Sequence, residues 1–557
     1  MKDGQKDKSS NINNMASISF YGSHNAAYAV EVDGKIELIL EVERFLNYKN
    51  SGIAQYKTAR PEDILFLSKH IVKHITKVTG IEEFDICYAL NTDVITDKRY
   101  NLEKHIPAKE YRYSNHHQSH AAGSFYQSSY KEALIFSFDG GANDGKFNIY
   151  KASRENSVEL IERVLSPNFD RIFSIDYDLG FPYMVFGHFL SDIRLETLDD
   201  GNLVYPGKLM GLASYGKIIK KWLPHFINFY KSDPQGTTYQ EKLNELGSKI
   251  NIEFDHTNRI GGETGYNIAA TSQKAFETCF LEVAKPYLDK YTNIPVIITG
   301  GCGLNIILNT KLVEEFDREV FVGPNPNDCG IAAGMLLHEL KPEHQVDLTY
   351  KGTPLLDYNN LASHIQNSPI SFKSFDFNLD VLVNDLVNGE IVGVVRGNSE
   401  HGPRALGNRS ILCDPSFPEM KKILNEKVKN REWYRPFAPV VRLEDISKYF
   451  EWESESRWMS FCPQVKKEWQ TKLASIVHID GTARVQTVTR HQNPWLYDLL
   501  TEMDYKKGIG VLLNTSFNVA GKPILSTIAD AFKIFEASQM DNLLVENYYI
   551  KKNYVKI

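Results

Sequence analysis

The sequence predicts an α/β protein in which a duplicated α/β domain is followed by a second α/β domain. The duplication rests on a pattern that occurs twice, because a short apolar strand runs into a glycine-rich turn at residues 133–141 and again at 295–303. At 557 residues the chain also exceeds what one hydrophobic core usually holds. An aperiodic stretch that mixes Lys, Pro, Glu, His and Gly predicts a boundary between Leu340 and Asn360. We therefore expect domains at 15–345 and 352–557.

The first elements follow from local patterning. Residues 1–14 are polar and contain no apolar segment, which predicts a disordered tail and no signal peptide. Two strands joined by a loop are predicted at 17–32, and a third strand at 35–41. Residues 61–79 carry apolar side chains at helical spacing and are predicted to form a helix.

Two histidines form the first candidate site. His116 and His120 are four residues apart, so on a helix both imidazoles lie on one face, which suits a single metal ion. The alternative is a pair of surface or packing histidines, and the short pattern taken alone favours it. His117 points elsewhere on such a helix, and we expect it to form structural hydrogen bonds.

Glycine-rich turns form a second group of candidate sites. Glycine lets main-chain N–H groups approach a phosphate closely, so these turns could bind a nucleotide. The candidate residues are Asp139, Gly140, Gly141, Gly300, Gly301, Asn305 and Gly330. A plain hairpin turn is an equally good interpretation of 139–145. Asp328 could add an oxygen ligand to a metal, although its spacing alone favours a helix N-cap.

Cationic residues gather in the segments 400–409, 429–435 and 481–484, the first of which follows a predicted strand at 391–395. Amide and hydroxyl side chains follow a second predicted strand at 511–513. The arginines stand beside Gly and Pro and not in an amphipathic charge run, which favours phosphate or carboxylate binding over surface salt bridges. The candidate residues are Arg404, Arg409, Lys429, Arg431, Arg435, Arg484, Asn514, Ser516 and Asn518. We expect Arg404 and Arg409 to turn into one pocket.

The composition narrows the function classes. A net charge of -7 disfavours broad nucleic-acid binding. No apolar run approaches the roughly 20 residues of a membrane span, so no membrane association is expected. The six cysteines form no CxxC pair, which disfavours a zinc ribbon and fits a reducing cytoplasm.

Taken together, the motifs resemble those of the NodU/CmcH-type O-carbamoyltransferases. The most specific motifs are Gly402-Pro-Arg-Ala-Leu-Gly-Asn-Arg-Ser-Ile411, Arg435-Pro-Phe-Ala-Pro439, Asp480-Gly-Thr-Ala-Arg-Val-Gln486 and Asn514-Thr-Ser-Phe-Asn518. The resemblance implies an actin-like ATPase-superfamily domain at 15–345 and a YrdC-like domain at 352–557. The YrdC signature matches Lys429-Asn-Arg431 and Ser516-Phe-Asn518.

The resemblance also implies a reaction in two steps. Carbamoyl phosphate yields carbamate, which ATP with Mg²⁺ converts to carbamoyl adenylate and pyrophosphate. The hydroxyl of an acceptor substrate bound in the first domain then takes the carbamoyl group. It implies that His116, His120 and Asp328 bind one divalent metal. Fe²⁺ is the first candidate, because two histidines and a carboxylate with open positions suit iron(II). The catalytic candidates are His24, Lys49, Lys429 and Arg484.

Other functions stay open at this point. An actin-like kinase or ATPase with an unrelated tail, a non-catalytic sensor and a tRNA threonylcarbamoylation-type enzyme are the alternatives, the last disfavoured by the acidic balance. The expected partners are carbamoyl phosphate, ATP and a small-molecule hydroxyl acceptor, with natural products the first class to consider. A homodimer and a cytoplasmic location complete the expectations.

Overall fold

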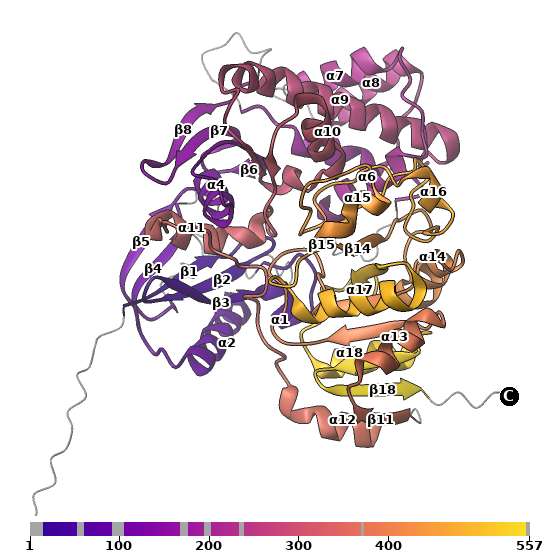
Figure 1. Cartoon of the computed structure of the whole chain (residues 1–557). Coiled ribbons are helices and arrows are strands. Elements are labelled where there is room, and N and C mark those ends of the chain that lie inside the picture. Colours follow the sequence, from indigo (N-terminus) through magenta and orange to yellow (C-terminus); the bar gives the residue numbers. More distant parts are fainter. Residues whose placement is uncertain are drawn as a thin grey trace, which may run out of the picture.

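The computed structural model describes residues 15–52, 61–91, 105–166, 176–193, 202–232, 239–368 and 372–552 (Figure 1). The predicted tail at 1–14 lies outside the described residues. The strands form three sheets, two of five strands and one of eight. No helix in the described ranges is long and apolar enough to cross a membrane.

The first two sheets repeat one topology. The first sheet has the order β3 (Lys35–Glu41), β2 (Ala27–Val32), β1 (Ala16–Tyr21), β4 (Phe84–Leu90) and β5 (Ala108–Ser114). The second has the order β8 (Ser157–Arg163), β7 (Gly145–Ser153), β6 (Glu132–Ala142), β9 (Val296–Thr299) and β10 (Val320–Phe321). In each, three antiparallel strands are followed by two parallel ones. This confirms the predicted duplication of an α/β unit.

Two helices lie between these sheets, α4 (His116–Gln127) and α11 (Ile331–Leu340). Their apolar side chains share one core with both sheets, which includes Phe125, Ile135 and Met335. The helices cross closely, since a Cβ added to Gly334 would lie 2.1 Å from the carbonyl oxygen of Ser119. Only glycine allows this approach, which helps to bring the first turn of α4 beside the residues that precede α11.

The outer faces of both sheets are covered by helices. In the first sheet, α2 (Pro61–Thr79), predicted from its periodicity, packs Ile71 and Ile75 against Ile18 and Val30. On the second sheet, Phe136 packs against Phe280 of α9. The neighbouring helices are α5 (Gly180–Val185), α6 (Tyr205–Ala213), α7 (Leu223–Lys231), α8 (Tyr239–Ile250), α9 (Gly262–Lys290) and α10 (Ile306–Phe316).

The eight-stranded sheet is mixed and holds the second half of the chain. Its order is β11 (Phe372–Asp376), β18 (Tyr548–Lys552), β17 (Asn542–Val545), β12 (Val392–Val395), β13 (Arg409–Cys413), β16 (Val511–Ser516), β14 (Ala438–Arg442) and β15 (Gln486–Val488). Its helices are α12 (Leu361–Asn367), α13 (Leu379–Val387), α14 (Met420–Ile423), α15 (Ile446–Tyr449), α16 (Lys467–Gln470), α17 (Pro494–Lys507) and α18 (Ile528–Ala537). Both predicted strands are confirmed, and β16 continues to Ser516, so Asn514 lies within it.

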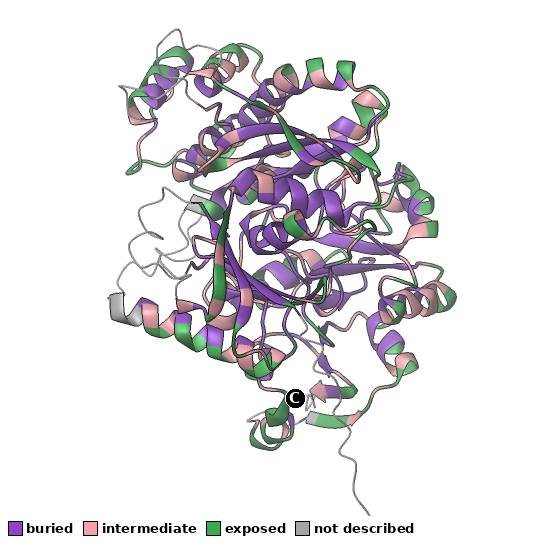
Figure 2. Cartoon of the chain, turned by 90° about the vertical axis from the view of Figure 1, so that its left-hand side faces the viewer, coloured by how far each residue is buried: buried purple, intermediate pink, exposed green. Residues whose placement is uncertain are grey.

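Buried residues concentrate in the strands and in the helices between the sheets, whereas the peripheral helices alternate buried and exposed positions (Figure 2). Several polar side chains are nevertheless buried where the first two sheets meet the third, including His120, Asp328, Glu400 and Lys429. Burying polar groups costs free energy unless they find partners, so this region is where a functional site is expected.

Candidate functional site

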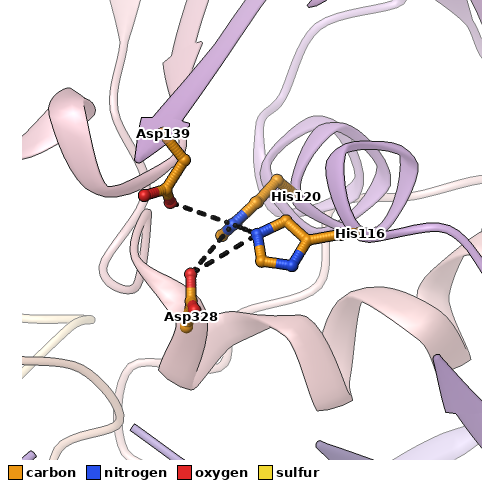
Figure 3. Close-up of side chains that lie close together, drawn as sticks. All are labelled: His116, His120, Asp139 and Asp328. Carbon is orange, nitrogen blue, oxygen red and sulfur yellow. Dashed lines mark hydrogen bonds and ion pairs between the residues drawn. The ribbon is translucent and has the colours of Figure 1, made fainter. Parts of the chain in front are cut away.

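A compact cluster contains the two predicted histidines and two aspartates (Figure 3). His116 Nε2 lies 3.5 Å from Asp328 Oδ1, and His120 Nε2 lies 3.4 Å from the same atom. His120 Nε2 is also 3.6 Å from Asp139 Oδ2. The histidines come from α4, Asp139 from β6 and Asp328 from the turn before α11. The structure thus adds Asp139, a candidate in the glycine-rich turn, to the three ligands that the resemblance implied.

Surrounding residues orient the two carboxylates. Tyr21 donates its hydroxyl hydrogen to Asp328 Oδ2 over 2.5 Å, and His24 Nδ1 lies 3.3 Å from the same oxygen. Asp139 Oδ2 accepts a hydrogen bond from the main-chain N–H of Gly301 at 2.7 Å. The Asp328 carboxylate therefore faces the cluster, and the helix-cap alternative does not describe it.

His117 has the structural role expected of it. Its ring contacts Ser137 Oγ and the carbonyl oxygen of Gly145. These contacts tie the start of α4 to the neighbouring strands and leave His116 and His120 to face Asp328.

The charges of the cluster balance one another. Burial by itself would raise the pKa of Asp328, but His24, His116 and His120 hold that pKa well below its usual range. Burial lowers the pKa of His120, yet hydrogen bonds to Asp139 and Asp328 outweigh it and raise the pKa to about 9. Two imidazole nitrogens and two carboxylates whose atoms lie within 4.8 Å of one another fit a divalent cation.

The arginines of the second half form an unbalanced positive group. Burial lowers the pKa of Arg404 to about 10, and Arg435 adds to the effect. Burial also depresses the pKa of Arg484, followed by repulsion from Arg404, Arg431 and Arg435. Among the residues that the structure describes, the Nε atoms of Arg404 and Arg484 are buried without a hydrogen-bond partner. The Nε atoms of Arg44 and Arg409 also lack partners in the described part of the chain. Arg404 and Arg484 additionally line a cavity, and buried donors beside a cavity indicate an anion site.

The residues of the predicted Lys-x-Arg and Ser-x-Asn signature meet beside these arginines. Lys429 Nζ donates to Asn518 Oδ1 and to the main-chain oxygen of Ser516, both at 2.5 Å. A π-helical turn, Leu424–Lys429, places this lysine. The Arg431 guanidinium lies over the ring of Phe437, 4.3 Å from its centroid.

The structure does not bring Arg409 to this site, in contrast to the prediction that it shares a pocket with Arg404. Its guanidinium donates to the carbonyl oxygens of Arg396 and Gly397 at 2.8 Å, and to that of Asn408 at 2.9 Å. Arg409 begins strand β13, so the strand direction turns it back onto the main chain. It holds the loop between β12 and β13, whereas Arg404 reaches the cavity.

One cavity of about 570 Å³ joins the two regions. From the first half of the chain, its wall includes His24, Lys49, Asp139, Gly140, Gly141, Gly301, Asn305 and Asp328. From the second half, it includes Arg404, Arg431, Arg435, Arg484, Asn514, Ser516 and Asn518. Gly300 and Gly330 instead serve close packing, because an added Cβ would lie 2.2 Å from the carbonyl oxygens of Phe138 and Asn325 respectively.

Sequence reasoning missed three residues of this region. Tyr21 supports Asp328, Glu41 lines the cavity, and Lys208 forms a buried ion pair with Glu432 at 2.6 Å. Tyr21 and Glu41 lie within segments that were predicted only as strands and the loop between them. For Lys208, a charged residue at the start of the largely apolar segment 208–213 is the signal that could have identified it.

Comparisons with known proteins cover nearly the whole chain. The family model of the carbamoyltransferase N-terminus matches residues 4–337, and that of the carbamoyltransferase C-terminus matches residues 383–552. Nodulation protein NolO of Bradyrhizobium diazoefficiens is 31% identical over 461 residues, which cover 79% of this chain and 79% of that protein. The 3'-hydroxymethylcephem-O-carbamoyltransferase of Streptomyces clavuligerus is 35% identical over 290 residues, covering 51% of this chain and 53% of that enzyme.

Solved structures are similar at lower identity. Full-length HypF in its phosphate- and nucleotide-bound form has 15% identity and a TM-score of 0.33, with 59% of this chain and 46% of that chain covered. Component A of the (R)-2-hydroxyglutaryl-CoA dehydratase of Acidaminococcus fermentans has 12% identity and a TM-score of 0.33, with 59% and 99% covered.

Proposed function

The chain belongs to the carbamoyltransferase family, as its motifs predicted, and we propose that it is an ATP-dependent O-carbamoyltransferase with two reaction sites in one cavity. In the first step, water hydrolyses carbamoyl phosphate to carbamate and phosphate, and a carbamate oxygen then attacks the α-phosphate of ATP. Carbamoyl adenylate forms and pyrophosphate leaves. In the second step, a hydroxyl oxygen of a small-molecule acceptor bonds to the carbamoyl carbon and AMP leaves.

The observation that carries this proposal is the single cavity that contains both sites. Its wall has two parts of different chemistry: the arginines of the second half, called here the arginine end, and the cluster carboxylates Asp139 and Asp328, called here the cluster end. A carbamoyl adenylate released into water would hydrolyse, so an enclosed passage between the ends would protect it.

The arginine end suits the first step. Arg404 and Arg484 offer buried donors without protein partners, so we assign them to the phosphate oxygens of ATP and carbamoyl phosphate. Preorganised cations there would also stabilise the negative charge that develops on departing pyrophosphate. Lys429, held by Ser516 and Asn518, would neutralise the carbamate or the α-phosphate.

The cluster end suits the second step. A divalent ion held by His116, His120, Asp139 and Asp328 would supply a Lewis acid that makes an acceptor hydroxyl easier to deprotonate. Fe²⁺ remains the first candidate. We assign His24, whose Nδ1 lies beside Asp328, to receive the hydroxyl proton; Lys49 lies in the same cavity wall. The acceptor class, the cytoplasmic location and a homodimer remain predictions.

The test separates this function from its main rival. Full-length protein is incubated with ATP and carbamoyl phosphate, and the phosphate products are measured. The proposed chemistry requires AMP and pyrophosphate formation that depends on carbamoyl phosphate, and a carbamoylated product when an acceptor library is added. ADP and phosphate without pyrophosphate would instead identify an actin-like kinase or ATPase.

A further inference from the structure

A short segment of the second half, Glu400–Arg404, contacts the first half of the chain at the cavity wall. Arg404 reaches the cavity from its end, and Gly402 sits at φ +120, where side chains are rarely tolerated. A Cβ on Gly402 would lie 2.1 Å from the carbonyl oxygen of Pro324. The segment therefore lies directly against the loop that carries the metal-cluster residue Asp328.

Two charged residues of the first half hold this segment from the other side. Arg44 donates through its two terminal nitrogens to the main-chain oxygens of Glu400 and Gly402. Glu41 Oε1 accepts from the N–H of Gly402 at 2.9 Å and lies 3.1 Å from Arg44 Nη2. Both side chains are almost fully buried, with 3% of Arg44 and 5% of Glu41 exposed.

Glu41 also lies near Cys329 and His401, close enough for a metal ion to be considered. His401 argues against it, because both of its ring nitrogens already have partners. Nδ1 faces the Asn325 amide at 2.7 Å, and Nε2 faces the carbonyl oxygen of Cys329 at 3.0 Å. The group is therefore a structural contact between two chain segments and not a metal site.

We propose that Glu41 and Arg44 are positioning residues for the first reaction step, which hold the main chain of Glu400 and Gly402 so that the Arg404 guanidinium stays turned into the cavity. The assignment rests on the proposed function for the identity of the anion that Arg404 binds. Arg44 is suited to this task because one planar guanidinium reaches two carbonyl oxygens, which a lysine ammonium on a flexible stem does less well.

The residues beside Arg404 explain why such support is needed. Arg404 lies among Arg435 and Arg484, which repel it, and no protein acceptor holds its Nε among the described residues. Before an anion binds, the Nε side of this guanidinium has no hydrogen bond within the described part of the chain, so its direction depends strongly on the backbone that carries it. A fixed backbone lowers the ordering cost that binding would otherwise meet.

A double-mutant cycle tests the proposal. Wild type, Arg44→Lys, Arg404→Lys and the double variant are compared for the calorimetric affinity of carbamoyl phosphate and of inorganic phosphate, together with Tm. Each single variant should bind carbamoyl phosphate about 10-fold or more weakly, and the double variant should be little worse than Arg404→Lys alone. In turnover, KM for carbamoyl phosphate should rise more than kcat falls.

Arg154→Lys is the matched control, because Arg154 also donates to main-chain oxygens, those of Ser128 and Pro342, but lies outside the cavity wall. It should lower Tm without changing anion affinity. Additive losses in the double variant, or an Arg44→Lys variant that changes Tm alone, would overturn the positioning role. The phosphate-binding cycle can be measured even if pyrophosphate release is absent, so failure of the proposed function is detected separately.

Discussion

The two ends of the cavity differ in their charges: charges of opposite sign meet at one end, and charges of the same sign meet at the other. In the His116–His120–Asp139–Asp328 cluster, cationic and anionic groups face one another. Against the effect of burial, hydrogen bonds to the two aspartates raise the pKa of His120, and the nearby histidines hold the pKa of Asp328 low. At the arginine end, burial depresses the pKa of Arg404 and Arg484, and the like charges that face one another there depress it further. The first end can be stable by itself, whereas the second is complete only with an anion. The contrast indicates that substrate binding energy is gained chiefly at the arginine end.

The largest expected effect separates the two ends by mutation. In His120→Ala, transfer of the carbamoyl group should fall about 1000-fold or more, since removal of a member of a catalytic unit typically costs this much. Bound divalent metal should decrease in parallel. Carbamoyl-phosphate-dependent pyrophosphate release should stay within about threefold of wild type, because His120 lies at the other end of the cavity.

Metal content by elemental analysis and separate assays of the two half-reactions check this prediction. His344→Ala, at an exposed position, is the control. If both half-reactions fell equally in a well-folded His120→Ala variant, the division of labour between the two ends would be wrong.

The second effect concerns the arginine end. Arg404→Lys keeps the charge but loses the bidentate geometry, so the first step should slow about 30- to 1000-fold, equivalent to about 2–4 kcal/mol. Transfer from carbamoyl adenylate supplied directly should be nearly unaffected. Steady-state kinetics at subsaturating carbamoyl phosphate measure the change, with Arg112→Lys at an exposed position as the control. Near-normal kinetics in Arg404→Lys would show that Arg404 does not bind the substrate anion.

A third prediction distinguishes Arg404 from Arg409, which the sequence treated alike. Arg409 is fully buried, and its contacts are main-chain oxygens of its own loop. Arg409→Lys should therefore lower the free energy of unfolding by about 2–4 kcal/mol, because a buried charge loses part of its hydrogen bonding. The affinity for carbamoyl phosphate should change by less than about threefold. Calorimetry and denaturant unfolding on the same variant measure both quantities, and a larger loss of affinity than of stability would restore Arg409 to the anion site.

The sequence predicted the parts of the fold that depend on local patterns. Strands 35–41 and 391–395 and helix 61–79 follow from periodicity, and glycine turns mark the repeated units. The duplication itself became certain only from strand order, because two sheets can share a topology without sharing residues.

Residue spacing predicted the part of the site that depends on local structure. His116 and His120 are close in sequence, so a helix was enough to pair them. Asp328 joins them through the packing of α4 against α11, and Asp139 joins them from strand β6. Arg404 and Arg409 show the limit of such reasoning. Their separation allows a shared pocket, but strand β13 begins at Arg409 and turns it toward carbonyl oxygens that no sequence motif identifies.

The smallest expected effect concerns the contact between the two halves, which is tested through the pH dependence of the stability. Burial lowers the pKa of His401 to about 4, and the nearby Arg44 charge acts in the same direction. In the unfolded chain this histidine has a pKa of about 6.5. Between these values the unfolded state binds a proton that the folded state does not, so stability is lost as pH falls. Above pH 6.5 the residue makes no pH-dependent contribution.

The loss from His401 should reach about 2 kcal/mol at pH 5. His401→Gln removes the titrating group while its amide can still donate to the carbonyl oxygen of Cys329 and accept from Asn325. The variant should therefore lose about 2 kcal/mol less than wild type between pH 7 and pH 5, measured by denaturant unfolding followed by tryptophan fluorescence. His344→Gln serves as the control. An unchanged pH dependence in His401→Gln would mean that the contact between the two halves persists when the imidazole is protonated. Its stability would then rest on the contacts of Arg44 and Glu41 with Gly402.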